Sequence, residues 1–181
     1  SARAMEIADA EGLGEDDKEL LEVASLFHDL GYARNYKEHE ATGAEMAAEY
    51  LQSKQYPEDK IMVVREMIMS TKMPPDPKNL MQRIICDADA YHLGTEEFVG
   101  RSELLRKEWS VARNITFTDE EWLIENIGFL EQHQYFTSYA RNTLIVQKDK
   151  NLNRLKKQLK EIEKERERLA KANRPDRGVE T

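Results

Sequence analysis

An apolar stretch in the first third of the chain ends on a histidine and an aspartate. Apolar side chains occupy positions 20, 21, 23, 24, 26 and 27 and would cover most of the circumference of a helix, which predicts a helix buried inside the protein. His28 and Asp29 close this stretch, and Gly31 follows two residues later, as is typical at the end of a helix. The sequence therefore places an imidazole and a carboxylate together at the mouth of an apolar core.

This placement of Asp29 is costly, because a carboxylate beside an apolar core must have its charge compensated. A metal ion would provide the compensation, and a ligand pair of imidazole and carboxylate suits zinc, manganese or iron. The alternative is purely structural: His28 would be a hydrogen-bonded core residue and Asp29 a simple cap. The pair by itself leaves both interpretations open.

The composition limits the classes of protein to which this chain can belong. Its 181 residues fit one domain of ordinary size with an appendage, and a net charge of −8 disfavours nonspecific binding to nucleic acid. The single cysteine, Cys86, excludes an intrachain disulfide and indicates a reducing, cytoplasmic location. No apolar run approaches the roughly 20 residues that span a bilayer. Residues 2–8 have helical spacing without a preceding cap, so we expect an N-terminal truncation.

The hydrophobic pattern predicts an all-α fold, because no strand-type alternation of useful length occurs. Asp16 or Asp17 can cap the helix that ends at His28, Asn79 can cap a later one, and Thr118 opens a capping box. We predict a helical domain over residues 1–147, an extended helix over 148–172 and a disordered tail over 173–181.

The last helix, expected to begin at Thr137, becomes polar almost all round after about residue 148. The exceptions form a stripe with heptad spacing, interrupted at Arg166: Leu152, Leu155, Leu159, Ile162 and Leu169. Such a stripe is typical of a coiled coil, here a possible homodimer, or of a helix that leans on a partner. A single helix held by its many Glu–Lys pairs explains the same pattern equally well.

A second acidic cluster lies within another apolar helix. Asp87 and Asp89 are two positions apart, so they point about 200° away from each other around a helix. One of them can then face inward as a ligand while the other caps, supports or meets solvent. We expect Asp89 to be the inward residue, because Ile85 and Leu93 lie on its face of the helix.

Three further residues are candidates for chemistry, each with an ordinary structural alternative. His39 begins a helix a short loop after His28 and could return to the same site, or it could be an exposed residue at a helix start. Lys72, in a proline-rich loop, and Arg34 could each contact a phosphate oxygen or simply be solvated.

A helix that ends in His28-Asp29, followed some sixty residues later by Ala88-Asp89 in another apolar helix, resembles the HD superfamily of metal-dependent phosphohydrolases. The family pattern is a His, then the His-Asp pair, then a distant Asp. No histidine precedes His28, so three of the four expected metal ligands are present and the N-terminal metal histidine is missing from this sequence.

Longer segments are similar to the HD domains that are joined to Pycsar-type membrane effectors. These segments are residues 27–32, 38–40, 71–74, 87–94 and 105–109, and the resemblance extends over roughly residues 1–155. In that family a membrane module follows the HD domain, so we expect the full-length protein to be tethered to a membrane even though this chain has no membrane segment.

The resemblance implies an HD-domain helical bundle that binds a divalent metal (Mn, Fe, Zn, Mg or Ni) and hydrolyses a nucleotide or related phosphoester through a metal-activated water. His28, Asp29 and Asp89 would be the metal ligands, with Asp87 orienting a ligand or the water. His39 would be a second-metal ligand or a proton-transfer group, and Lys72 and Arg34 would contact substrate. The alternative is a non-catalytic nucleotide sensor that signals through its C-terminal helix.

Overall fold

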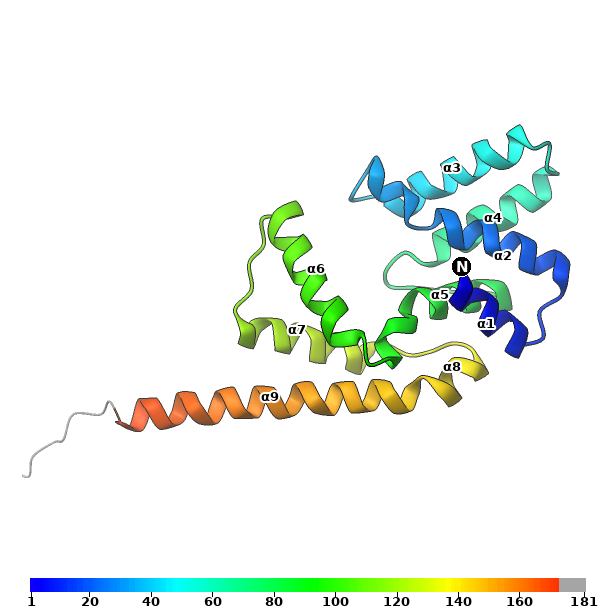
Figure 1. Ribbon diagram of the computed structural model, residues 1–181. Coiled ribbons are helices and arrows are strands. Elements are labelled where there is room, and N and C mark those ends of the chain that lie inside the picture. Colours follow the sequence, from blue (N-terminus) through cyan, green and yellow to red (C-terminus); the bar gives the residue numbers. More distant parts are fainter. Residues whose placement is uncertain (173–181) are drawn as a thin grey trace, which may run out of the picture. The chain divides into compact units, whose positions relative to one another are not determined.

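The computed structural model describes residues 1–172; the tail expected at 173–181 lies outside the described residues. All regular secondary structure in the described part is helical, as predicted, and it ends in a long C-terminal helix (Figure 1). The elements in order are α1 (Ala2–Ala10), α2 (Glu15–Phe27), η1 (Leu30–Ala33), α3 (His39–Ser53), α4 (Glu58–Ser70), α5 (Leu80–Asp89), η2 (Ala90–Gly94), α6 (Phe98–Ala112), α7 (Asp119–Gln132), α8 (Ser138–Thr143) and α9 (Ile145–Ala172).

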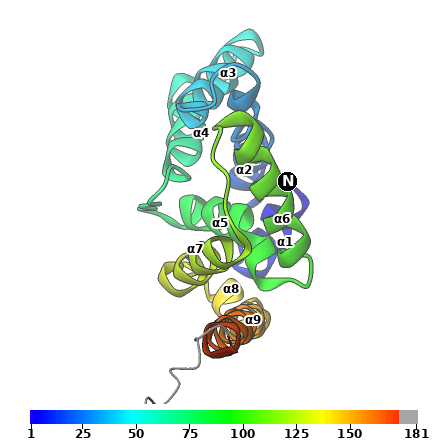
Figure 2. The same ribbon diagram turned by 90° about the vertical axis from the view of Figure 1, so that its left-hand side faces the viewer.

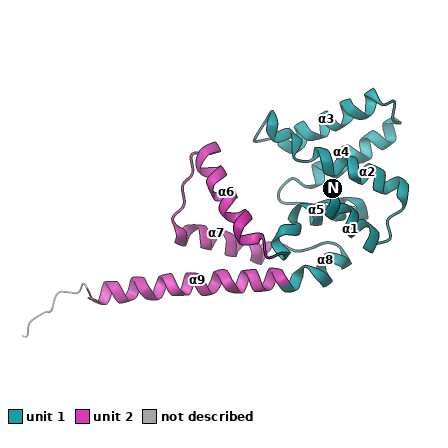
Figure 3. Cartoon of the chain, viewed as in Figure 1, with its two compact units in different colours: residues 1–95, 134–146 teal, residues 96–133, 147–181 magenta. Residues whose placement is uncertain are grey.

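The chain divides into two compact units (Figure 3). Unit 1 contains Ser1–Thr95 and Gln134–Val146, and unit 2 contains Glu96–His133 and Gln147–Thr181. Unit 1 is therefore built from two separate stretches of sequence. Residues 96–133, which we had expected within the first helical domain, belong to unit 2. The domain boundary that the sequence predicts at residue 148 stays a prediction.

Two of the three expected caps are present at the helix starts. The side chain of Asn79 accepts a hydrogen bond from the Gln82 amide at 3.0 Å, and Thr118 forms the predicted capping box with Glu121. The expectation for α2 was wrong, because Gly14 occupies the N-cap position and the helix already begins at Glu15. Its acidic residues instead lie in the first turn, where they favour the positive end of the helix dipole.

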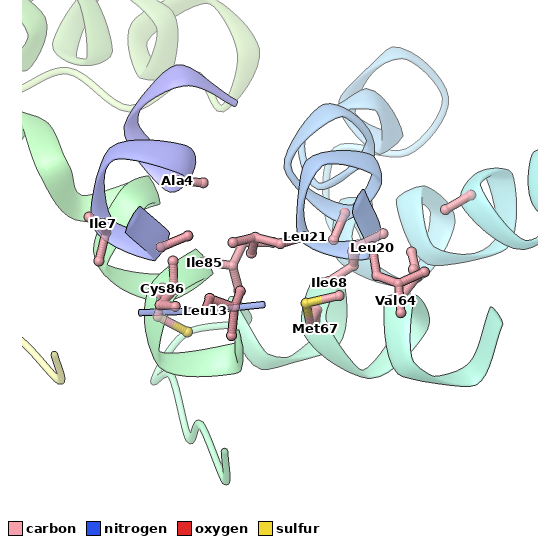
Figure 4. Close-up of a cluster of buried hydrophobic side chains, with 14 of the residues drawn as sticks. Ala4, Ile7, Leu13, Leu20, Leu21, Val64, Met67, Ile68, Ile85 and Cys86 are labelled. Atoms are coloured by element: carbon pink, nitrogen blue, oxygen red, sulfur yellow. The ribbon is translucent and has the colours of Figure 1, made fainter. Parts of the chain in front are cut away.

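The core of unit 1 lies where α1, α2, α4 and α5 pack against one another. Figure 4 shows Leu21, Met67, Ile68 and Ile85 gathered between these helices, and all four are essentially inaccessible to solvent. Each such side chain contributes about 1.5–3 kcal/mol when it leaves water. These contacts fix the ends of α2 and α5, which carry the candidate metal ligands.

Helix α3 packs closely along α4, as both ribbon views show (Figures 1 and 2). Its small residues Gly43, Ala44 and Ala47 are buried and allow this close packing. At Gly43, an added Cβ would lie 2.5 Å from the Phe27 carbonyl oxygen. Helix α3 is thereby held against the end of α2, next to the candidate site.

The second stretch of unit 1 closes the core with Tyr135, Ala140 and Leu144, all buried. It contains the break that we did not expect: α8 ends at Thr143 and α9 starts at Ile145, so the last helix does not run continuously from Thr137. This stretch is also hydrogen-bonded to the end of α1, because the backbone amide of Tyr139 donates to the carboxylate of Glu11 at 2.6 Å.

Unit 2 contains α6, α7 and α9 and has a small aromatic cluster. Trp122 is buried, packs edge-on against Trp109 with 5.7 Å between ring centroids, and donates from its indole nitrogen to Ser102 at 2.9 Å. Along the heptad stripe, Leu155 is 5% exposed whereas Leu169 is 52% exposed. The stripe is thus covered by its own chain at Leu155 and open near its end. A partner or a homodimer at this stripe stays a prediction.

Within residues 1–172, no helix combines the length and the apolar character needed to cross a membrane.

Candidate metal centre

The ends of two packed helices bring the three predicted ligands together. His28 is the C-cap of α2, Asp29 follows it, and Asp89 is the last residue of α5. Because α2 and α5 pack against each other, residues sixty positions apart become neighbours. A ligand atom from each of the three residues lies within 4.8 Å of the others. The three residues that the family resemblance implies as ligands therefore lie in one cluster, and their role as metal ligands stays a prediction.

The imidazole of His28 faces both carboxylates through the same nitrogen. Its Nε2 lies 3.2 Å from Oδ2 of Asp29 and 3.7 Å from Oδ1 of Asp89. The His28 side chain is 20% exposed, whereas those of Asp29 and Asp89 are 62% and 48% exposed. The cluster therefore has a partly buried imidazole and carboxylates that open toward solvent.

The other ring nitrogen of His28 is fixed by the backbone of α2. Its Nδ1 lies 2.9 Å from the carbonyl oxygen of Ser25, and because a carbonyl oxygen only accepts, Nδ1 must carry the hydrogen. In the neutral imidazole this leaves the lone pair on Nε2, which points at the two carboxylates. A backbone carbonyl that orients a histidine in this way is the usual support for a metal-binding imidazole.

The charged groups of the cluster shift one another's pKa values. Burial opposes protonation of His28, but the carboxylates of Asp29 and Asp89 outweigh it and raise the pKa of His28 from 6.5 to about 10. The pKa of Asp29 is lowered, first by its hydrogen bond to His28 and, against the effect of burial, by the charges of His28 and His39. In the absence of a cation, the proton on His28 thus compensates the acidic pair.

His39 influences this cluster electrostatically, because its charge is one of the effects that lower the pKa of Asp29. Its ring stacks on Tyr32 with 3.7 Å between centroids, and its Nε2 lies 3.3 Å from Oε1 of Glu40. Its Nδ1 is buried, and no hydrogen-bond partner for this atom is present among the described residues. An orphaned imidazole nitrogen of this kind is available for a proton or a ligand.

Two neighbours of His39 did not emerge from the sequence. Glu40 is buried, although an acidic residue in the first turn of a helix ordinarily signals only a helix start. Tyr32 was seen as a loop residue, and its stacking depends on the turn at η1, which sequence spacing does not determine. The aromatic character of the loop between Asp29 and His39 is the signal that could have found it.

The expectation that Asp89 would be the inward residue of the acidic pair was wrong with respect to burial. Asp87 is completely buried, and it accepts hydrogen bonds from the Phe136 and Thr137 amides and the Thr137 hydroxyl. Asp89 instead lies at the last turn of α5, where it reaches His28 while remaining half-exposed. The apolar face on which the expectation rested continues into η2, where the helix geometry changes.

The remaining candidates lie on the surface of unit 1. Lys72 is exposed in the turn that follows α4, and Arg34 is exposed at the end of η1. The predicted contact of either side chain with substrate stays a prediction, as does the role of Asp87 in orienting a water or a ligand.

A cavity of about 730 Å³ lies in unit 2 and is lined by Trp122, Leu123 and Ile162 among others; none of its lining residues is a candidate ligand. One fixed imidazole nitrogen and two half-exposed carboxylates fit a divalent cation that prefers nitrogen and oxygen ligands.

The part of the chain that contains the cluster matches a known protein family. The family model described as HD domain matches residues 1–94, about half of the chain and nearly all of the first stretch of unit 1. No curated protein and no solved structure matches the chain significantly.

Proposed function

The chain belongs to the HD domain family, whose members are typically metal-dependent hydrolases, and from this premise we propose that it hydrolyses a nucleotide or a related phosphoester. The observation that carries the proposal is the convergence of His28, Asp29 and Asp89 within 4.8 Å. Such a set of one imidazole and two carboxylates would hold one divalent cation.

The residues of the cluster have distinct parts in this proposal. Ser25 holds the His28 ring in the orientation that presents Nε2, while Asp29 and Asp89 supply negative charge on the solvent side. A divalent cation bound there would lower the pKa of a water and accept charge from a phosphoryl oxygen. The partly exposed carboxylates leave a phosphoester access from solvent.

His39 is the group we assign to proton transfer, because its Nδ1 has no hydrogen-bond partner among the described residues and its charge acts on Asp29. Coordination of a second cation by this residue is the alternative role. We assign phosphate contacts to Lys72 and Arg34, since both are cationic and exposed on unit 1.

The first experiment measures bound metal. The chain is loaded with manganese, freed of excess and analysed by plasma mass spectrometry, beside Asp89→Ala and a control, Asp76→Ala, which removes a solvent-exposed aspartate. We expect near-stoichiometric metal in the wild type and the control and a loss of most of it in Asp89→Ala. Equal metal in all three proteins would refute the proposed centre. Hydrolysis of phosphoesters by the loaded protein is then tested with the same variants.

We propose further that this is the HD type joined to Pycsar-type membrane effectors, in a protein tethered at the cytoplasmic face of a membrane. The support is the sequence similarity of the motifs at residues 27–32, 71–74 and 87–94. A chain that also carries the family's first histidine should bind metal more tightly than these 181 residues do.

A second candidate function is a nucleotide sensor without turnover. The observation that favours it is α9, a helix of 28 residues whose apolar stripe is open at Leu169. A sensor would be stabilised by a nucleotide in thermal unfolding while releasing no product. An enzyme would release product and lose this activity in Asp89→Ala.

A further inference from the structure

The short loop between Asp29 and His39 carries two tyrosines that are tied to the candidate metal centre. Tyr32 lies in η1, and its amide donates to the carbonyl oxygen of Asp29 at 3.1 Å. Its ring covers one face of the His39 imidazole, with 3.7 Å between centroids and an angle of 14° between the planes. Tyr32 is thus fixed from both sides by residues of the site.

Tyr36 adds a second ring beside Tyr32. Its ring centroid lies 5.3 Å from that of Tyr32, at an interplanar angle of 59°, which is a favourable tilted geometry for an aromatic pair. Tyr32 is nevertheless 42% exposed, and Tyr36 is partly exposed. The two rings therefore form a preassembled aromatic surface that still reaches solvent, instead of part of the core.

The electrostatic surroundings agree with this position. Burial and the negative charges of Asp29, Glu40 and Asp89, together with Tyr36, raise the pKa of the Tyr32 hydroxyl to about 12. Tyr32 therefore lies within the field of the carboxylates that form the candidate centre, and its hydroxyl stays neutral at physiological pH. Arg34, exposed in the same loop, adds a positive charge between the two tyrosines in sequence.

We propose that Tyr32 and Tyr36 form a stacking surface for the base of a nucleotide whose phosphate occupies the metal centre. This inference rests on the proposed function and deepens it, because it assigns the substrate to phosphoesters that carry a planar aromatic group. Bases have flat apolar faces that stack on tyrosine rings, and this stacking tolerates differences in base identity. Tyr36 is the residue to test, since a substitution of Tyr32 would also remove its stacking on His39.

The test compares two kinds of phosphoester on the manganese-loaded full chain. The substrates are adenosine and cytidine 5′-monophosphate, which carry a base, and glycerol 2-phosphate, which carries none. The variants are Tyr36→Ala, Tyr36→Leu, which keeps apolar volume without the ring, and Tyr36→Phe, which keeps the ring. Tyr50→Ala is the control, because Tyr50 is an exposed tyrosine on α3, at 46%. Thermal unfolding of each variant shows whether it is folded.

We expect the ratio of kcat/KM for the nucleotides to that for glycerol 2-phosphate to fall about tenfold in Tyr36→Ala and Tyr36→Leu, mainly through KM, given the usual strength of base stacking. Tyr36→Phe and Tyr50→Ala should keep the wild-type ratio. An unchanged ratio in both ring-deleted variants would overturn the stacking surface, as would an equal loss on both kinds of substrate.

A failure of the proposed hydrolysis is distinguishable from a failure of this inference. If the loaded wild type releases no phosphate from any substrate, binding of the same compounds is measured by calorimetry. Nucleotide binding that weakens about tenfold in Tyr36→Ala, with no change in Tyr50→Ala, would support the surface even without turnover. Equal nucleotide affinity in these variants, or no nucleotide binding by the wild type, would refute it.

Discussion

The carboxylate of Asp87 accepts two hydrogen bonds from Thr137, one from its amide and one from its hydroxyl, each at 2.7 Å to Oδ2. The Phe136 amide donates to the same carboxylate at 2.9 Å. Burial raises the pKa of Asp87 while these hydrogen bonds lower it, with burial the larger effect. A buried carboxylate with this many donors joins the two stretches of unit 1.

The first prediction concerns the hydrogen bonds that Asp87 accepts. Asp87→Ala leaves the donors of Phe136 and Thr137 buried without an acceptor, so we expect a loss of about 3 kcal/mol in the free energy of unfolding, measured with urea. Asp76→Ala, in an exposed loop, should change it by less than about 0.5 kcal/mol. If Asp87→Ala retained full stability but lost only turnover, the residue would be catalytic and not structural.

The second prediction is the pH dependence of the metal-free protein. Since the pKa of His28 is 6.5 when unperturbed and about 10 in the fold, the folded chain binds this proton more tightly than the unfolded chain does. The stabilisation is complete below pH 6.5 and is lost as the pH rises through about 10. The free energy of unfolding should therefore decrease over this range in urea titrations.

The control for this pH dependence is Asp89→Asn, which removes one of the charges that raise the pKa of His28. Its free energy of unfolding should decrease less steeply over the same range. Metal binding must expel the His28 proton, so manganese affinity should also increase with pH. Identical slopes in the wild type and Asp89→Asn would show that other groups cause the dependence.

The third prediction uses a glycine beside the site. A Cβ on Gly31 would lie 1.8 Å from the carbonyl oxygen of His39, and because that atom is backbone, Gly31→Ala must displace the loop. We expect a loss of about 1–3 kcal/mol in the free energy of unfolding and weaker metal binding. Gly128→Ala, in α7 with no atom within 4 Å of the added Cβ, should leave metal binding intact and favour its helix by up to about 1 kcal/mol. Equal metal binding in both variants would argue against a precise loop geometry.

The fourth prediction tests the substrate contact assigned to Lys72. If its ammonium binds the phosphate, Lys72→Ala should lower kcat/KM for a phosphoester about tenfold or more, the usual effect of losing a hydrogen bond to a charged group. Lys78→Ala is the control, because Lys78 is an exposed lysine in the same loop that pairs with Asp76. Equal rates in both variants would leave Lys72 as a solvated residue.

Most of the helices could be predicted because their signals are local. The cap at Asn79 and the capping box at Thr118 lie within four residues of the helix that each begins. The break at Leu144 could not be predicted in this way. Leu144 is buried against Gly94, where an added Cβ would meet its Cβ at 2.6 Å, and nothing in the local sequence announces a contact fifty residues away.

The same distinction between local signals and distant contacts applies to the candidate site. The two motifs at His28-Asp29 and Asp89 could be recognised in the sequence because they place charged residues next to apolar helices. In the structure, the packing of α2 on α5 brings them together. The burial of Asp87 was misjudged because its partners, Phe136 and Thr137, come from a distant stretch. The stacking of Tyr32 on His39 depends on the path of a loop, which hydrophobic periodicity does not describe.

The discontinuous make-up of unit 1 has a consequence for how it can be assembled. During synthesis on the ribosome, the first stretch of unit 1 emerges before the second. At that point the Asp87 carboxylate lacks its hydrogen-bond donors, and the core surface against which Tyr135, Ala140 and Leu144 pack is still exposed. Unit 1 cannot be completed until residues 134–146 have been synthesised, after all of residues 96–133. A fragment cut at residue 94, where the family match ends, would therefore be an incomplete folding unit that exposes part of its hydrophobic core.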